Sequence, residues 1–268
     1  MNSNTPAPAQ HIAPQGLKWI ISDTLIMTWR GLLRYVRLPQ LLVFSTIQPI
    51  LFLLLFTYVF GGAIQTPGLN YLNFLVPGIL VQVVIFGSVQ TGVGLSEDLS
   101  KGMIDRFRSL PMARSAVLVG RTLADLVRNI FVMVLMLIVA FIIGFRPEGG
   151  FWGVVLAMGM IALFGFAFSW ISAAIGLSVK STEAAQVAGF IWVFPLVFAS
   201  SIFVPIETMP HWLEAFATIS PITVTVNSVR ALMLGTPIGD NWWQSLIWIG
   251  GILIDFSMLA VLQYRKVK

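Results

Sequence analysis

Long apolar stretches separated by short polar segments constrain this chain more than any other feature of its sequence. A helix that crosses the hydrocarbon core of a bilayer needs about 20 mainly apolar residues. Six stretches meet this requirement, at roughly 41–62, 71–95, 117–144, 151–179, 184–205 and 243–263. With 57% hydrophobic and only 10% charged residues, the chain lies outside the range of soluble domains. The sequence therefore predicts an all-α polytopic membrane protein with six transmembrane helices.

A seventh helical pattern precedes the first span, over about 17–37. Three arginines share one face with Asp23, whereas aliphatic residues lie on the other face: Arg30, Arg34 and Arg37 against Leu17, Ile21, Leu25 and Leu32. This predicts a helix in the plane of the membrane interface, with its arginines toward anionic headgroups. Residues 1–16 are polar and contain three prolines, so we expect a disordered tail there and a single transmembrane domain over 17–268.

The placement of lysine and arginine predicts the orientation. Membrane proteins carry an excess of these residues in their cytoplasmic loops. If the N-terminus is cytosolic, only Arg146 and Arg230 of the 16 Lys and Arg residues fall outside. An even number of spans then puts both termini in the cytosol, and we expect a multi-pass protein of the cytoplasmic (inner) membrane.

The segment 206–242 is too polar and too often broken by proline to be one clean span. Apolar residues nevertheless repeat in it at helical spacing, at Ile222, Val226, Val229 and Met233. We therefore expect a re-entrant pair of short helices that dips into the outer leaflet before the last span. Backbone of this kind is tolerated at membrane depth only where protein or water covers it.

A dense charged segment, 97–111, follows the second span on the predicted cytosolic side. On a helical projection one face is apolar and the opposite face carries Glu97, Lys101, Asp105 and Arg108. Such a helix can lie against the membrane and show its charges to a water-side partner. A solvated connecting helix without a partner fits the same pattern, so both interpretations remain open.

Ionisable residues inside membrane spans are costly and often functional. Asp125 and Arg128 are three positions apart, so they share a helix face and can neutralise each other. We favour a structural pair over a transport role. Asp255 lies near the middle of the last span. It can be protonated, bond a neighbouring helix or line a wet path, and we favour the structural role.

Other polar and aromatic residues in the spans allow two interpretations. Gln48, Gln82 and Gln90 can line a cavity or join helices by hydrogen bonds. Phe194 and Phe198 are typical packing residues that can also line a pathway.

Motifs for bond chemistry are missing from the sequence. It contains no phosphate-binding Gly-x-x-x-x-Gly-Lys-Ser/Thr loop, no His-Glu-x-x-His pair, no Gly-x-Ser-x-Gly elbow and no cysteine. Its two histidines, His11 and His211, fall on opposite sides of the predicted membrane. We therefore expect no catalytic site, metal or cofactor in this chain. The net charge of +5 lies mainly at the predicted membrane surface, so we expect no nucleic-acid partner.

Four short strings in these topological positions resemble the type-2 ABC exporter permeases, in particular the daunorubicin-resistance branch. They are Asp105–Met112 (DRFRSLPM), Gly144–Pro147 (GFRP), Pro210–Trp212 (PHW) and Ser220–Thr223 (SPIT). The resemblance covers about 17–265. It implies export of a hydrophobic or amphipathic cargo (a drug, lipid or natural product) and no enzymatic activity in this chain. It also implies a separate cytosolic ATPase in two copies, which binds ATP and Mg, and a second permease copy or paralogue.

The resemblance also assigns roles by position. The segment 97–111 corresponds to the coupling helix that docks on the ATPase, through Glu97, Lys101, Gly102, Asp105, Arg106, Arg108, Leu110 and Pro111. Arg30, Arg34 and Arg37 correspond to the connecting helix, which also approaches the ATPase. The second and fifth spans line the pathway, which makes Gln82, Gln90, Phe194 and Phe198 possible lining residues.

Two alternatives use no ATPase. A secondary transporter favours broken helices and ion ligands at the midplane, of which only Asp255 is a sign. A membrane-embedded lipid-modifying enzyme favours clustered acids or histidines, which the sequence does not contain.

Overall fold

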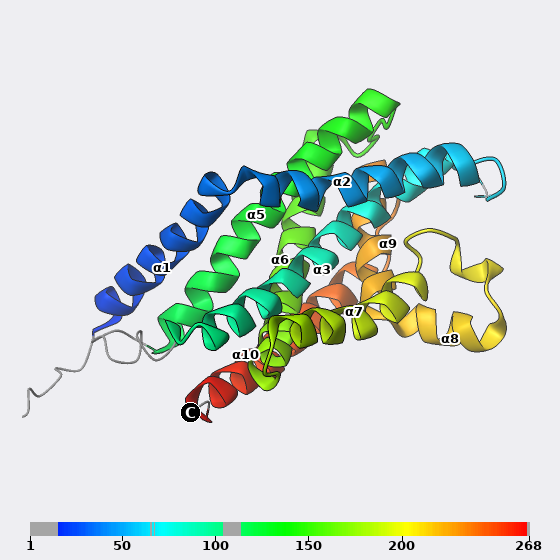
Figure 1. Cartoon of the computed structure of the whole chain (residues 1–268). Coiled ribbons are helices and arrows are strands. Elements are labelled where there is room, and N and C mark those ends of the chain that lie inside the picture. Colours follow the sequence, from blue (N-terminus) through cyan, green and yellow to red (C-terminus); the bar gives the residue numbers. More distant parts are fainter. Residues whose placement is uncertain (1–15, 65, 67, 104–113, 267–268) are drawn as a thin grey trace, which may run out of the picture.

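The computed structural model describes residues 16–64, 66, 68–103 and 114–266 (Figure 1). The predicted tail, apart from Gly16, lies outside these residues. All regular structure in the described part is helical: α1 (Leu17–Arg37), α2 (Pro39–Leu55), η1 (Phe56–Phe60), α3 (Tyr71–Ser100), α5 (Arg114–Ile143), α6 (Gly150–Ser178), α7 (Thr182–Phe198), η2 (Ile206–Thr208), α8 (His211–Ile219), α9 (Pro221–Leu234) and α10 (Asn241–Lys266).

Five of the described helices are long and apolar enough to cross a membrane. They are Leu42–Phe60, Tyr71–Ser100, Ser115–Ile143, Gly150–Ser178 and Asn241–Lys266. The fold is therefore that of an all-α polytopic membrane protein. The fifth predicted span, 184–205, is wrong in its extent, because α7 ends at Phe198.

A buried turn replaces the end of that fifth span, and the backbone of Ser201 in this turn bonds to partners elsewhere in the chain. The Ser201 amide donates to the Thr223 hydroxyl at 3.2 Å. The Ser201 carbonyl accepts from the guanidinium of Arg230 at 2.7 Å. Because these bonds are made outside the helix, the buried backbone of Ser201 is paired although the helix ends at Phe198.

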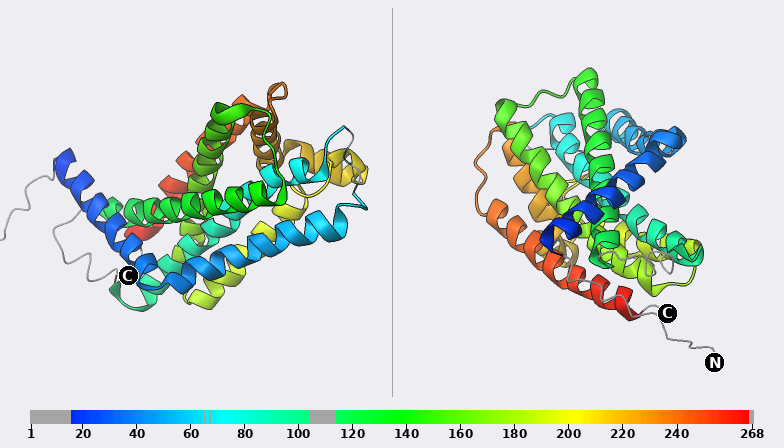
Figure 2. Two further views of the ribbon diagram at one scale, coloured as in Figure 1. Left: turned by 90° about the horizontal axis from the view of Figure 1, so that it is seen from above. Right: turned by 90° about the vertical axis from the view of Figure 1, so that its left-hand side faces the viewer.

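Helix α3 forms the centre of the bundle. The most apolar part of α3 is 83% buried, compared with 11% for the span formed by α2 and η1 at the edge. It packs against α5, α6, α7 and α9 (Figures 1 and 2). A Cβ atom at Gly92 would lie only 2.3 Å from the Ser172 oxygen of α6, and one at Gly176 only 2.2 Å from the Gly92 oxygen. Small residues thus allow α3 and α6 to approach closely, as in other membrane helix pairs.

Helix α1 crosses α5 obliquely and packs on it (Figure 2). Two glycines allow this contact, because a Cβ at Gly31 would lie 2.6 Å from that of Ala124, and one at Gly120 would lie 2.5 Å from that of Met27. Ile21 and Leu25, on the predicted apolar face, are 52% and 61% exposed. The side of α1 that packs on α5 is therefore a different, small-residue face.

The segment 206–242 contains α8 and α9, and α9 is largely buried against α3, α6 and α10. The distribution of lysine and arginine predicts that Arg230 falls on the outer side of the membrane. It is instead buried in α9, with 9% of its surface exposed. Its guanidinium donates to the Phe74 carbonyl at 3.1 Å and to Asn227 at 2.8 Å, and lies 3.8 Å from the centre of the Phe74 ring. Arg230 thereby joins α9 to α3 and to the turn after α7.

The charged segment 97–111 is not one continuous helix. Residues 97–100 form the last turn of α3, and Lys101 caps it. Gly102 then adopts a φ of 65°, in the left-handed region that glycine enters without steric cost. The remaining predicted coupling residues, Asp105, Arg106, Arg108, Leu110 and Pro111, lie outside the described residues.

Candidate functional site

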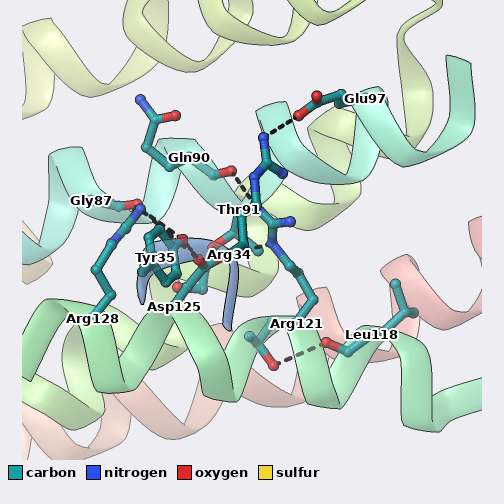
Figure 3. A network of polar contacts seen from close by, with 12 residues as sticks. Arg34, Tyr35, Gly87, Gln90, Thr91, Glu97, Leu118, Arg121, Asp125 and Arg128 are labelled. Atoms are coloured by element: carbon teal, nitrogen blue, oxygen red, sulfur yellow. Dashed lines mark hydrogen bonds and ion pairs between the residues drawn. The ribbon is translucent and has the colours of Figure 1, made fainter. Parts of the chain in front are cut away.

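A buried polar network joins α1, α3 and α5 (Figure 3). Asp125 of α5 has no exposed surface and is its centre. The Asp125 carboxylate accepts hydrogen bonds from the Tyr35 hydroxyl of α1 at 2.5 Å and the Thr91 hydroxyl of α3 at 2.7 Å. It also accepts one from Nε of Arg121, one turn earlier in α5, at 3.2 Å. One side chain thus bonds to three helices.

Arg128 occupies the other side of this carboxylate. Its Nη1 lies 3.9 Å from Asp125 and donates to the Tyr35 hydroxyl at 3.3 Å. Its Nη2 donates to the Gly87 carbonyl of α3 at 2.6 Å and to Oδ1 of Asn129 at 3.0 Å. We call Tyr35, Thr91, Arg121, Asp125 and Arg128 the Asp125 network.

The Asp125 network places one carboxylate between two guanidinium groups. A buried ion pair repays its desolvation only when further hydrogen bonds satisfy the remaining polar atoms. Here the hydroxyls of Tyr35 and Thr91 and the backbone of α3 supply those bonds. Burial, together with the nearby Asp125 charge, raises the pKa of Tyr35 to about 12. The Tyr35 hydroxyl therefore remains a donor throughout the physiological pH range.

A second, more exposed contact joins α1 to the end of α3. Glu97 accepts from Nη2 of Arg34 at 2.6 Å through one carboxylate oxygen and from Nζ of Lys101 at 2.6 Å through the other. Exposed ion pairs contribute little to stability; this one joins α1 to the C-terminal turn of α3. Arg30 and Arg37 line a nearby cavity of about 470 Å³.

The predicted pathway residues lie on α3 and α7, which pack side by side. Gln82 is 2% exposed, whereas Gln90 is exposed. Phe194 and Phe198 are 41% and 42% exposed, and their rings stack with centroids 5.5 Å apart. Phe86 of α3 lies 5.5 Å from Phe194, so aromatic rings connect the two helices.

Asp255 lies on an exposed face of α10. Within the described part of the chain it has neither an ion pair nor a hydrogen bond to a neighbouring helix. Contacts among the described residues therefore give no support to the structural role predicted for it.

Sequence reasoning placed Asp125 and Arg128 on one helix face but missed their other partners. Arg121 could have been found, since it precedes Asp125 by four positions, the spacing of neighbours on a helix. Tyr35 and Thr91 come from other helices, and the sequence contains no signal that brings them to Asp125.

Comparisons with known proteins agree with this architecture. The family model described as ABC-2 type transporter matches residues 22–234. The chain is 38% identical over 248 residues to the daunorubicin resistance ABC transporter permease protein DrrB1 of Streptomyces coeruleorubidus, covering 92% of this chain and 87% of that protein.

More distant relatives carry similar names. One is named "Probable doxorubicin resistance ABC transporter permease protein DrrC", from Mycobacterium tuberculosis, and is 24% identical over 92% of this chain and 89% of its own length. Another, from Escherichia coli, is named "Probable multidrug ABC transporter permease YbhR" and is 24% identical over 75% of this chain and 54% of its own length. Together with the match of the family model, these similarities show that the chain belongs to the ABC-2 type transporter family, as a permease subunit.

Proposed function

We propose that this permease exports a hydrophobic or amphipathic cargo across the cytoplasmic membrane, driven by a separate ATPase in two copies. The observation that carries the proposal is the 38% identity to a daunorubicin-resistance permease over 92% of the chain. A second permease, identical or paralogous, completes the pathway. ATP and Mg bind to the ATPase and not to this chain.

In this proposal α7 is the fifth of six spans and α10 is the sixth. Its 17 residues reach about 25 Å at 1.5 Å per residue, slightly less than the hydrocarbon core. The turn after Phe198 and the helices α8 and α9 complete the crossing from the outer leaflet. Both termini then lie in the cytosol, in agreement with the distribution of lysine and arginine.

The ATPase docks on the segment 97–111 and on α1 in this proposal. Glu97 and Lys101 lie at the start of that segment, and Arg34 links it to α1. The Asp125 network links α1 to α3 and α5. A force applied at the docking segment therefore reaches three helices together, which supports rigid-body switching between inward and outward access. Asp105 and Arg108 are further docking charges in this proposal, and they are assigned from the sequence alone.

The cargo pathway in this proposal runs along α3 and α7. Gln82 and Gln90 provide hydrogen-bonding groups on α3, and the exposed rings of Phe194 and Phe198 provide apolar surface on α7. Such a mixed lining suits a cargo with both an apolar body and polar groups.

The ion pair between Arg34 and Glu97 allows a direct test of coupling. We expect Glu97→Arg to let the reconstituted complex hydrolyse ATP without transporting daunorubicin, because α1 and the docking segment no longer move together. The double variant Arg34→Glu, Glu97→Arg should regain transport, since it restores an ion pair of opposite polarity.

The matched control is Glu148→Arg, an exposed residue at the opposite end of the bundle. It should transport like the wild-type protein. Normal transport by the Glu97→Arg variant would show that the Arg34–Glu97 contact has no part in coupling.

A further inference from the structure

A cavity of about 470 Å³ lies where α1, the last turn of α3 and the start of α5 meet. Its volume falls within the range of about 300–1,000 Å³ that is typical of small-ligand sites. Among the described residues, its charged wall consists of Arg30, Arg34 and Arg37 of α1, Asp98 of α3 and Arg121 of α5. We call this cavity the arginine cavity. Because Arg30 and Arg37 are exposed, they form its rim.

The guanidinium groups of the arginine cavity are only partly used by the protein. A guanidinium carries five N–H donors. Within the described part of the chain, Arg34 places one donor on Glu97. Arg121 places two, one on Asp125 and one on a backbone carbonyl of α3. Arg37 makes neither a hydrogen bond nor an ion pair with a described residue. Further acceptors can therefore bind to these groups.

The arginine cavity has an excess of positive charge. The carboxylate in its described wall interacts with three of the four arginines. Glu97 lies beside the cavity but also pairs with Lys101. Asp125 likewise has a second cation, Arg128, at 3.9 Å. Four guanidinium groups against one carboxylate leave three positive charges, or two when Asp23 of α1 is counted as well. The cavity therefore favours an anion.

The helix dipole explains only part of this cluster. Arg34 and Arg37 lie in the last turn of α1, where cations interact favourably with the C-terminal end of a helix. Arg30 lies about two turns before that end, and Arg121 belongs to another helix. The guanidinium of Arg121 lies against Gly94 of α3, where a Cβ atom would overlap it. Two helices thus bring their arginines together against a third.

The position of the arginine cavity along the bundle is that of a membrane interface. The candidate span that contains α2 begins at Leu42, five positions after Arg37. The span of α3 ends two positions after Asp98, and that of α5 begins six positions before Arg121. Three spans therefore reach the cavity at their ends, which is the depth of the lipid headgroups. In the predicted orientation this is the cytoplasmic leaflet, where anionic lipids attract basic segments.

Helix α1 exposes an apolar face beside its arginines. Trp19, Ile26, Trp29 and Val36 recur at intervals of seven or three positions and are 60–73% exposed. With 3.6 residues per turn, the arginines lie between this face and the face that packs on α5. Tryptophan is enriched at membrane–water interfaces. A ligand that combines an anionic headgroup with apolar chains is complementary to both faces.

From the positive excess, the depth and the apolar face, we propose that the arginine cavity binds one anionic phospholipid through the phosphate of its headgroup. Arg30 and Arg37 contact the phosphate at the rim, since guanidinium groups bind phosphate oxygens in pairs. Arg34 and Arg121 form the inner wall. The acyl chains lie along the exposed apolar face of α1. This lipid comes from the surrounding membrane, so its site is separate from the cargo pathway proposed on α3 and α7.

Native mass spectrometry of the full-length permease, delipidated in a non-ionic detergent, measures this binding. The probes are dioleoylphosphatidylglycerol, dioleoylphosphatidylcholine and inorganic phosphate. We expect one molecule of phosphatidylglycerol to bind at least tenfold more tightly than phosphatidylcholine, which has the same acyl chains and phosphate but a cationic choline. Inorganic phosphate at equal concentration should not displace the lipid, because it lacks the apolar chains.

Substitutions of Arg37 test the site. Arg37→Gln should weaken phosphatidylglycerol binding about fivefold, the equivalent of about 1 kcal/mol for one cation near an anionic headgroup. The melting temperature without lipid should not change, because Arg37 is exposed. Arg37→Lys keeps the charge and should retain most of the affinity. The matched control is Arg265→Gln, which removes an exposed arginine of α10 on the same predicted side of the membrane and should not change the affinity.

Four results would overturn the inference. The first is equal affinity of the wild-type chain for the two lipids, and the second is an equal loss of affinity in Arg37→Gln and Arg265→Gln. Displacement of the lipid by an equal concentration of inorganic phosphate would assign the cavity to a free anion. Normal lipid binding by Arg37→Gln, together with loss of ATPase co-purification, would assign it to docking of the ATPase.

Discussion

At the scale of single residues, Asp125 is the centre of the polar contacts between α1, α3 and α5. It is fully buried between the guanidinium groups of Arg121 and Arg128. Removing one partner of a buried ion pair leaves uncompensated charge, at a cost of about 3–5 kcal/mol. We therefore expect Asp125→Asn to lower the melting temperature of the purified protein sharply.

The double variant Asp125→Asn, Arg121→Met tests the electrostatic explanation. It removes one charge of each sign, so it should recover a substantial part of the lost stability. If the double variant melts at the same temperature as Asp125→Asn, or lower, charge balance is not the reason for the loss.

Arg230 of α9 joins α3 and the turn after α7, because its planar guanidinium donates to the carbonyls of Phe74 and Ser201 at the same time. We expect Arg230→Lys to cost about 1.5–3 kcal/mol, the range for one hydrogen bond to a charged group, because an ammonium cannot reproduce the same fork. The measurement is the thermal stability of the variant beside Arg265→Lys, an exposed position on α10 that should be neutral. Equal stability of the two variants would contradict the assigned role of Arg230.

Among these residues, local spacing in the sequence predicts some contacts and not others. The i, i+3 spacing places Asp125 beside Arg128, and the i, i+4 spacing contains Arg121. Tyr35 is 90 positions away from Asp125 in the chain, and no local pattern predicts that contact. Arg230 is charged, so its sequence predicts an exposed position. It is instead buried, and its guanidinium donates to the backbone carbonyls of Phe74 and Ser201.

At the scale of elements, the contact between α3 and α6 depends on glycine. A Cβ at Gly92 would lie 2.3 Å from a backbone oxygen, which cannot move like the end of a flexible side chain. We expect Gly92→Ala to destabilise the protein by about 1–3 kcal/mol or more, as overpacked cores do.

Gly159 provides a matched control on α6. A Cβ there would meet no atom within 4 Å, so Gly159→Ala should be neutral or stabilise the helix by up to about 1 kcal/mol. Thermal unfolding of both variants in the same detergent compares them. Similar melting temperatures would contradict the proposed close packing of α3 on α6.

The length of an apolar stretch predicts a spanning helix well, because a helix in lipid must form all its backbone hydrogen bonds within itself. The predicted spans at 71–95, 117–144 and 151–179 correspond to α3, α5 and α6 with small differences at their ends. The predicted ends of the spans are wrong where residues from other elements contact the ends of the helices. The turn after α7 bonds to Thr223 and Arg230, and α3 continues to Ser100, past the apolar stretch, where Arg34 pairs with Glu97.

At the scale of the whole molecule, the orientation remains a prediction from lysine and arginine placement. The chain contains no cysteine, so single cysteines can be introduced without background. Ser100 and Asp240 are both exposed. We expect Ser100→Cys to react with a membrane-impermeant maleimide only from the cytosolic side and Asp240→Cys only from the outside. Labelling of Ser100→Cys from the outside would reverse the orientation and remove the basis for docking at 97–111.

Dependence of this permease on a separate ATPase can be measured directly. The tagged chain is purified from membranes of its own host under mild conditions, and its transport activity and subunit composition are determined on the same sample. We expect a nucleotide-binding subunit in equal amount, identified by mass spectrometry, and transport that stops when ATP is withheld. A homogeneous, transport-active preparation that contains no nucleotide-binding subunit would contradict it.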